Sequence, residues 1–285
     1  MDEIDGATRL VGVMGWPVAH SLSPAMHNAA FAALSLNWRY VPLPVHPDDV
    51  GAAVRGLRAL GFAGCNVTVP HKQAVMPHLA GLSPEAAATG AVNTLVRAGG
   101  SWRGENTDVR GFMDDLAAHG VAVTGKQCVV LGAGGSARAV TWGLLNAGAA
   151  VAVVSRTLAR SAALVEALSA HLPGAALSCH ERTALAHLAA DSTALIVNAT
   201  SVGMWPHVDE SPWPEDAPIP AGAVVYDLVY RPARTRLLQQ AEAAGARAIG
   251  GVGMLARQGA ASFALWTGAE PPVDMMMESL ARSAV

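Results

Sequence analysis

The chain has 285 residues, of which 52% are apolar and 14% are charged, so it can bury one large core or two ordinary ones. Its formal net charge of −3 argues against a nucleic-acid or membrane-surface partner, which would favour a basic patch. The three cysteines are few and widely spaced, and the ten histidines show no ligand spacing. We therefore expect free thiols, a reducing compartment and no bound metal.

Strand-like and helix-like segments alternate over the first seventy residues. Ser23 followed by Pro24 predicts a helix start, with Ser23 as the N-cap and Pro24 at the first helical position. The segments in chain order are a strand at 9–14, a helix from Ser23, a strand at 38–45, a helix at 47–61 and a strand at 66–70. This order predicts an α/β domain with a mainly parallel sheet.

The pattern restarts near Asp108, which we take as a domain boundary. A helix is expected at 110–120, and a strand, a glycine turn, a helix and a second strand follow over 126–157. The later segments are strands at 194–201, 223–230 and 246–251 and a helix at 254–266. The chain is thus predicted to fold as a two-domain α/β protein.

Residues 66–72, "NVTVPHK", alternate polar and apolar positions and then reach Lys72. Only Lys72 and Lys126 are lysines among the 19 basic residues, so arginine supplies nearly every other positive charge. Lysine can be tuned to give and take a proton, whereas arginine stays protonated. Either this is an ordinary strand that ends at the surface, or its polar face, with Asn66 and Thr68, lines a site in which Lys72 has a role.

The stretch "VVLGAGGSARAV" carries a dinucleotide-binding pattern. Gly132, Gly134 and Ala137 form G-x-G-x-x-A between a strand and a helix, where glycine lets the backbone approach a pyrophosphate. After the second strand, "SRTLAR" has no acid to bind a ribose 2′-hydroxyl. Arg156 and Arg160 are four residues apart, which places both on one helix face and suits the 2′-phosphate of NADP. We predict NADP rather than NAD.

Neutral polar groups lie beside glycine at several strand ends. They are Asn66 and Thr68, Asn93 and Thr94, Asn106, Thr107 and Asp108, and Asn198 and Thr200. Ligands of open α/β sheets bind at the carboxyl ends of strands, and amides and hydroxyls there suit a ligand rich in hydroxyls. Asp108 could alternatively serve only as a helix N-cap.

The ordered set of motifs resembles the shikimate dehydrogenases over nearly the whole chain. The matching blocks are "GWPVAHSLSPAMHN", "NVTVPHK", "GAVNT", "GENTDVRGF", "LGAGGSARA", "SRT", "NATSVGM", "DLVYRPARTRLL" and "GVGMLARQGAASFALWTG". The resemblance implies a substrate-binding domain at 1–107 plus 251–285 and a Rossmann-type NADP-binding domain at 108–250. It also implies NADPH-dependent, reversible reduction of 3-dehydroshikimate to shikimate, on the chorismate route to aromatic amino acids.

The resemblance further assigns roles to individual residues. Lys72 and Asp108 match the catalytic pair, with Lys72 exchanging the proton and Asp108 orienting it. The substrate-binding positions implied are Ser21, Ser23, Thr68, Asn93, Tyr230 and Gln258. The cofactor-binding positions implied are Gly132, Ala133, Gly134, Gly135, Ser136, Ser155, Arg156, Thr157, Arg160, Leu228 and Gly251. Many members have Asn-Arg-Thr where this chain has Ser155-Arg156-Thr157, so contacts near the adenosine can differ.

Three alternatives stay open at this point. The chain could be a quinate/shikimate dehydrogenase or an aminoshikimate dehydrogenase with NAD(P), or a non-catalytic NADP-binding sensor on the same scaffold. A sensor should lose Lys72 or Asp108, and this chain keeps both. The acidic N-terminus lacks the pattern of a signal peptide, so a cytoplasmic location is expected. We also expect a monomer or homodimer that has no nucleic-acid or membrane partner.

Overall fold

The computed structural model describes residues 4–188 and 192–283. The chain divides into two compact units, which are Met1–Gly111 with Leu255–Ser283, and Phe112–Met254. Residues 1–3 and 284–285 of the predicted substrate domain and residues 189–191 of the predicted NADP-binding domain lie outside the described residues. No helix in the described ranges is both long and apolar enough to cross a membrane.

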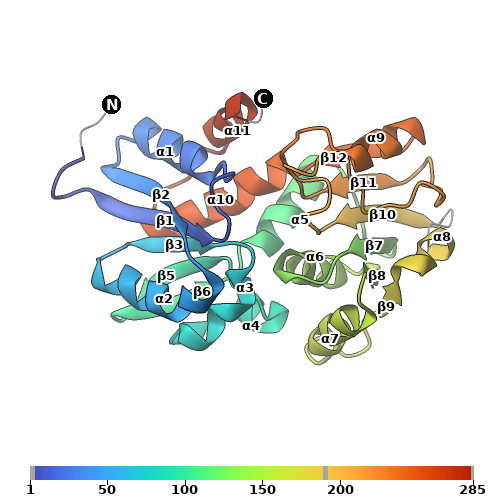
Figure 1. Cartoon of the computed structure of the whole chain (residues 1–285), viewed down its shortest axis with the longest axis horizontal. Coiled ribbons are helices and arrows are strands. Elements are labelled where there is room, and N and C mark those ends of the chain that lie inside the picture. Colours follow the sequence, from blue (N-terminus) through green and yellow to red (C-terminus); the bar gives the residue numbers. More distant parts are fainter. Residues whose placement is uncertain (1–3, 189–191, 284–285) are drawn as a thin grey trace. The chain divides into compact units, whose positions relative to one another are not determined.

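The first unit is built on a mixed sheet, with the strand order β2-β1-β3-β5-β6-β4 among the described residues (Figure 1). Its strands are β1 (Arg9–Gly15), β2 (Trp38–Pro44), β3 (Gly64–Val67), β4 (Gly81–Leu82), β5 (Thr94–Ala98) and β6 (Ser101–Glu105). Its helices are α1 (Ser23–Ala33), η1 (Pro47–Asp49), α2 (Val50–Ala59), α3 (His71–Ala74), η2 (Met76–His78), α4 (Pro84–Thr89) and α11 (Val273–Ser283). Two more helices, α5 (Asp108–Ala118) and α10 (Val252–Thr267), contain the two divisions between the units.

The β5–β6 hairpin was not predicted, although its turn has a sequence signal. Gly99 and Gly100 both adopt positive φ, of 54° and 80°, a conformation that two adjacent glycines allow at a tight reversal. β5 therefore runs antiparallel to both β3 and β6, whereas β1 is parallel to β2 and β3. The predicted α/β class is confirmed, and the sheet is mixed because of this hairpin.

Helices cover both faces of the first sheet. Val54 and Leu57 of α2 pack with Cys65, Leu95 and other buried side chains on one face. The opposite face carries α1, α10 and α11, with α1 packed on α11 and β2 (Figure 1). Because helices cover both faces of the sheet, a ligand can reach it only at the edges where its strands end.

The second unit is built on a parallel sheet with the order β12-β11-β10-β7-β8-β9 among the described residues. Its strands are β7 (Gln127–Leu131), β8 (Ala150–Ser155), β9 (Leu177–Glu181), β10 (Thr193–Asn198), β11 (Val224–Asp227) and β12 (Arg247–Gly250). Its helices are α6 (Gly135–Asn146), α7 (Leu158–Ser169), η3 (Arg182–Ala184), α8 (Leu185–Leu188) and α9 (Arg236–Ala243). Counted from β7, this is the order 3-2-1-4-5-6 of doubly wound dinucleotide-binding folds.

The second sheet also has a core on each face. One contains Val140 and Leu144 of α6 with Leu164 and Leu168 of α7. The other contains Leu237 and Ala241 of α9, with Trp213 and the α8 side chain Leu185. Because all six strands are parallel, their carboxyl ends meet at one edge, and β7 and β10 adjoin where the strand order reverses.

Candidate active site

One edge of the mixed sheet brings together chain segments that are far apart in sequence. Asn66 of β3 pairs with Thr94 of β5, and Thr94 pairs with Glu105 of β6. Because β5 is antiparallel, its first residue lies beside the ends of its two neighbours. The sequence predicted Asn93 and Thr94 at a strand end, and the structure shows which end. Asn93 precedes β5 and Thr94 begins it, and the antiparallel pairing puts this amino end beside the carboxyl ends of β3 and β6.

Lys72 and Asp108 form a nearly buried ion pair at this edge. The Lys72 ammonium donates to Asp108 Oδ2, and the two side chains are 11% and 5% exposed. Lys72 lies in the short helix α3, and its backbone carbonyl accepts from the amide of Val92, which ties α3 to the segment before β5. Two opposite charges in such close contact, away from water, hold each other in a fixed orientation.

Asp108 does not act as the N-cap of α5, which was the alternative left open by the sequence. It is the first residue of the helix, and the Asn106 side-chain oxygen accepts from the backbone amides of Asp108 and Val109 at 3.1 and 3.4 Å. The Asn106 amide group in turn donates to Thr89 and to the carbonyl of Ala91. Since Asn106 satisfies the helix start, the Asp108 carboxylate is available to Lys72.

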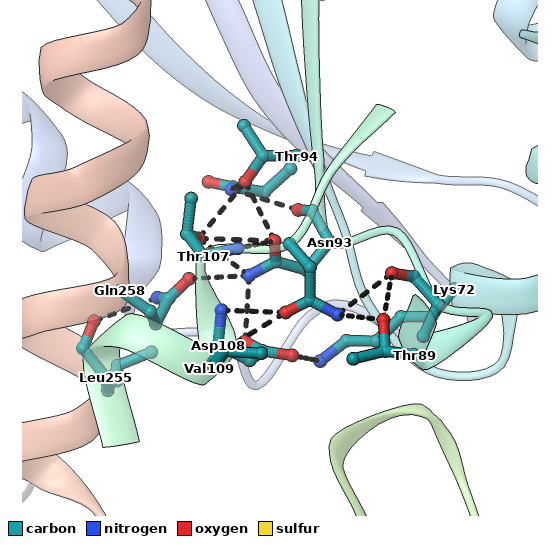
Figure 2. Close-up of polar contacts among 12 residues, drawn as sticks. Lys72, Thr89, Asn93, Thr94, Thr107, Asp108, Val109, Leu255 and Gln258 are labelled. Carbon is teal, nitrogen blue, oxygen red and sulfur yellow. Dashed lines mark hydrogen bonds and ion pairs between the residues drawn. The ribbon is translucent and has the colours of Figure 1, made fainter. Parts of the chain in front are cut away.

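Asn93 and Gln258 complete the group around Asp108 (Figure 2). Asn93 Nδ2 lies 2.8 Å from Asp108 Oδ1 and 3.3 Å from Gln258 Oε1. Gln258 belongs to α10 and reaches this point because Gly111 of α5 has no side chain: a Cβ there would lie 2.6 Å from the Cβ of Gln258. The structure thus brings Lys72, Asp108, Asn93 and Gln258 into one hydrogen-bonded group.

Ser21, Ser23 and Thr68 follow neighbouring parallel strands of the same sheet. Thr68 is the first residue after β3, and a Cβ on Gly15, the last residue of β1, would lie 2.4 Å from its methyl group. The predicted N-cap role of Ser23 was wrong, because the N-cap of α1 is Leu22 and Ser23 is already helical. The Ser23 amide donates to Ser21 Oγ at 3.3 Å. No capping bond therefore accounts for the Ser23 hydroxyl.

The interpretation of Asn66 as a site-lining residue was also wrong. Its side chain is 6% exposed and accepts from Tyr40 Oη, while its amide group donates to the Asn93 carbonyl, Thr94 Oγ1 and Ser262 Oγ. Ser262 was not predicted at all. The signal was present, since it lies four residues after Gln258, a spacing that places both on one face of a helix.

The turn between β7 and α6 depends on its glycines and leaves the start of α6 without a side-chain cap. Gly132 adopts a φ of +113°, and a Cβ there would lie 3.0 Å from the carbonyl oxygen of Ala199. Gly134 is the N-cap of α6 and makes no side-chain capping bond, so the first amides of the helix are left for another acceptor. The predicted Ala133, Gly135 and Ser136 belong to the same turn and first helical residues.

The arginines after β8 are arranged differently from the prediction. α7 begins at Leu158, so Arg156 precedes the helix and only Arg160 lies in its first turn; the shared helix face was wrong. Both side chains are exposed, and neither makes a hydrogen bond or ion pair with any residue that the structure describes. The Ser155 hydroxyl donates to the Thr157 carbonyl at 2.7 Å, so it stabilises the turn in which these arginines lie.

Leu228 and Gly251 directly follow β11 and β12. A Cβ on Gly251 would lie 2.3 Å from the carbonyl oxygen of Leu228, so only glycine lets the two segments meet. Asp227, the last residue of β11, is fully buried and accepts from Asn198, the Val229 amide and Thr235. Burial raises the pKa of Asp227 to about 6, an effect that outweighs the three donors. The half-buried Tyr230 lies two residues beyond Leu228 in the same segment.

These features together fit a dinucleotide with an added phosphate. The glycine turn offers amides to a pyrophosphate, and the two unpartnered guanidinium groups offer charge to a phosphate ester. Among the described residues no group of three or more His, Cys, Asp or Glu side chains could hold a metal ion.

Two family models match the sequence. The first, described as shikimate dehydrogenase substrate binding domain, matches residues 13–95, and the second, described as shikimate 5'-dehydrogenase C-terminal domain, matches residues 251–281. A shikimate dehydrogenase (NADP(+)) from Moorella thermoacetica is 47% identical over 278 residues, which are 97% of this chain and 94% of that protein. The chain belongs to the shikimate dehydrogenase family.

Solved structures of this family and of a relative share the fold. A shikimate 5-dehydrogenase from Thermus thermophilus in complex with NADP(H) and shikimate has a TM-score of 0.85 and 39% identity, and the match covers 96% of this chain and 99% of that one. A quinate dehydrogenase from Corynebacterium glutamicum in complex with NAD has a TM-score of 0.87 and 30% identity, with 96% and 99% covered. A shikimate dehydrogenase and a quinate dehydrogenase thus share this scaffold.

Proposed function

We propose that this protein reversibly reduces 3-dehydroshikimate to shikimate with NADPH. The observation that carries the proposal is the nearly buried Lys72–Asp108 pair, flanked by Asn93 and Gln258, in a chain of the shikimate dehydrogenase family. A buried acid–base pair surrounded by amide groups suits a polyhydroxylated ring whose carbonyl must gain a proton.

Lys72 acts as the proton donor in the direction of reduction. NADPH, when bound, supplies the hydride to the substrate carbonyl carbon. The carbonyl oxygen then carries negative charge, and the Lys72 ammonium stabilises it and transfers one proton, which leaves an alcohol and a neutral amine. Asp108 holds the ammonium in place through Oδ2. In the direction of oxidation, neutral Lys72 removes the proton from the hydroxyl group.

Side chains at the same sheet edge bind the rest of the substrate. Ser21 and Ser23 are proposed to hold its carboxylate, because both hydroxyls lie where the chain enters α1 and that of Ser23 has no capping role. Thr68, Asn93 and Gln258 are proposed to bind the ring hydroxyls. Tyr230, of the other unit, is proposed as a further substrate contact.

The cofactor is proposed to bind along the carboxyl ends of the parallel sheet. The pyrophosphate would be held by backbone amides of the glycine turn, the 2′-phosphate by Arg156 and Arg160, and the nicotinamide beside Leu228 and Gly251. Ser155 and Thr157 would shape the loop around the adenosine.

These assignments give each unit a separate binding role. We propose that the unit with the mixed sheet binds the substrate and that the unit with the parallel sheet binds NADP, the roles expected from the sequence for residues 1–107 with 251–285 and for residues 108–250. A monomer or homodimer in the cytoplasm, without nucleic-acid or membrane partners, remains the accompanying prediction.

Oxidation of shikimate by the purified protein tests the proposal directly. Shikimate and quinate are each supplied with NADP⁺ and with NAD⁺, and the initial rate of reduced-cofactor formation is measured. Shikimate with NADP⁺ is expected to be the preferred pair, because no acid follows β8. Faster turnover of quinate with NAD⁺ would instead place the chain with the quinate dehydrogenases. Binding of NADPH without turnover of either substrate would indicate a sensor.

A further inference from the structure

The hydrogen-bond partners of Asn93 determine which way its side-chain amide is oriented. The backbone amide of Thr107 can only donate, and the atom that it faces at 2.7 Å is Asn93 Oδ1. A flipped side chain would set an NH₂ group against that N–H. Asn93 Nδ2 must therefore face Thr107 Oγ1 and Asp108 Oδ1, both at 2.8 Å, as Figure 2 shows.

A second layer of buried polar groups lies behind Asn93. We call Asn66, Thr94 and Ser262 the inner cluster. Thr94 Oγ1 donates to Asn93 Oδ1 at 3.1 Å and accepts from Asn66 Nδ2 at 3.0 Å, and it lies 2.8 Å from Ser262 Oγ. Thr94 and Ser262 are fully buried, and Asn66 is 6% exposed. Tyr40 Oη donates to Asn66 Oδ1 at 2.8 Å and so fixes which way the Asn66 amide points.

The inner cluster reaches the proposed site at few points. Ser262 Oγ donates to the Gln258 backbone carbonyl at 3.1 Å, and both Ser262 and Thr94 lie within 3.3 Å of Thr107 Oγ1. Among the described side chains assigned to chemistry, only that of Asn93 receives a hydrogen bond from the cluster. Asn66 Nδ2 also donates to the Asn93 backbone carbonyl at 3.1 Å, so both the backbone and the side chain of Asn93 are held from behind. Buried networks of this kind are rigid when every member is satisfied, because an unpaired member would cost its full desolvation free energy.

We propose that Thr94 is a positioning residue: its hydroxyl, held by Asn66 and Ser262, acts with the Thr107 amide to hold the Asn93 amide that donates to the catalytic carboxylate of Asp108. This inference rests on the proposed function, since it assigns Asp108 and Lys72 to proton transfer. If the Asn93 amide turns or shifts, Asp108 Oδ1 loses a hydrogen-bond donor. The carboxylate can then rotate, which changes the direction of the hydrogen bond between the Lys72 ammonium and Asp108 Oδ2. Catalytic geometry is sensitive to displacements of this size.

Two substitutions at Thr94 separate positioning from packing. Thr94→Val keeps the shape and removes the hydroxyl, whereas Thr94→Ser keeps the hydroxyl and removes a methyl group. We expect Thr94→Val to lower kcat for shikimate oxidation by roughly tenfold, because a misplacement of about 1 Å near the chemistry can cost up to about 10²-fold. Thr94→Ser should retain nearly all of the activity. The pH at which kcat is half-maximal should move in Thr94→Val alone.

Thr141→Val is the matched control. Thr141 is also a fully buried threonine, but its hydroxyl has no hydrogen-bond partner among the residues described. The same substitution there removes an unsatisfied polar group, so it should leave kcat and its pH dependence unchanged and should not lower the unfolding temperature.

Each outcome is decisive. An equal loss of kcat in Thr94→Val and Thr94→Ser would mean that the methyl group matters, and unchanged kcat in both would mean that the hydroxyl does not; either result overturns the proposal. If Thr94→Val does not fold, Tyr40→Phe and Ser262→Ala carry the test, and kcat must fall in both while the unfolding transition stays cooperative. Wild-type protein that does not turn over shikimate would refute the proposed function itself, before any variant is compared.

Discussion

The candidate sites of the two units consist of different chemical groups. At the edge of the mixed sheet, buried side chains contact other side chains across long sequence separations, as Asn93 does with Asp108 and Gln258. At the carboxyl ends of the parallel sheet, a glycine turn offers backbone amides, and the exposed side chains of Arg156 and Arg160 make no hydrogen bond or ion pair with the described residues. The first site is organised before a ligand arrives, and the second is organised largely by its ligand.

This difference suits the two ligands. A small ring with several hydroxyl groups is recognised by the directions of individual hydrogen bonds, and a buried network keeps those directions fixed. A dinucleotide carries its own charges, so a turn with free amides and exposed guanidinium groups suffices to bind it. Substitutions in the first unit should therefore change rates, and those in the second should change cofactor affinity.

The largest effect is expected at Lys72. Lys72→Ala removes the proton donor, and shikimate oxidation should slow by roughly 10²–10⁴-fold, the usual size of general acid–base catalysis. Lys72→Arg keeps the charge beside Asp108 but cannot deprotonate, so it should remain nearly as slow. Steady-state kcat with NADP⁺ measures both. Lys126→Ala is the control, because Lys126 is the other lysine and is exposed before β7. Near wild-type activity of Lys72→Arg would show that Lys72 contributes charge alone.

Acid should weaken the first unit through His27. This ring is fully buried, stacks on Tyr40 with centroids 4.4 Å apart, and neither nitrogen has a hydrogen-bond partner among the described residues. Burial lowers the pKa of His27 to about 3. Unfolded His27 binds a proton near pH 6.5, so stability is complete above that pH and falls as pH drops toward 3, by roughly 5 kcal/mol at most.

His27→Phe tests this pH dependence. It removes the titrating group but keeps a ring against Tyr40, so its unfolding free energy should fall less than that of the wild type between pH 6.5 and pH 4. Urea unfolding at several pH values measures the slope, and a constant offset between the two proteins does not affect it. Parallel curves for the two proteins would contradict the expectation.

Asp227 should have the opposite effect in the second unit. Its raised pKa, about 6, means that the folded state keeps a proton that the unfolded state releases near pH 4. Its contribution to stability therefore declines as pH rises from about 4 to 6, by roughly 3 kcal/mol at most, and is constant above that. Asp227→Asn should remove the decline. Hydrogen exchange of peptides from each unit, corrected for intrinsic rates, should show acid protecting β10 and β11 in the wild type but not in the variant.

The same contrast explains what could be predicted from the sequence. Local patterns identified the glycine turn, the strand before it and the helix after it, because a turn of backbone amides is encoded within a dozen residues. Lys72 and Asp108 were also predicted, and the structure places them in contact.

Nonlocal contacts were missed. Nothing near Asn66 in the sequence indicates that Tyr40 and Ser262 would satisfy its amide, so a residue that supports Asn93 was interpreted as one that faces the ligand. The β5–β6 hairpin makes β5 antiparallel to β3, and the predicted mainly parallel sheet did not identify which strand would be reversed. The helix start at Leu158 likewise separated two arginines that spacing alone had placed on one face.

The smallest effect is expected at those two arginines. Arg156→Gln and Arg160→Gln should each weaken NADPH binding by about tenfold, the lower end for a hydrogen bond to a charged group. NADH lacks the 2′-phosphate, so its affinity should stay the same. Fluorescence titration of both cofactors at fixed ionic strength gives the ratio, with Arg182→Gln as a control at another exposed arginine of this unit.

The ratio of NADPH affinity to NADH affinity also tests whether the ligand positions the two arginines. Arg156 lies in the turn that Ser155 stabilises, whereas Arg160 is held by the first turn of α7. If the ligand organises the arginines, both variants should lose NADPH affinity and the losses should shrink together as salt screens the phosphate. A loss that is equal for NADH and NADPH would mean that the arginines bind the shared pyrophosphate. Arg156 and Arg160 would then give no evidence that the second site is organised by the 2′-phosphate of its ligand.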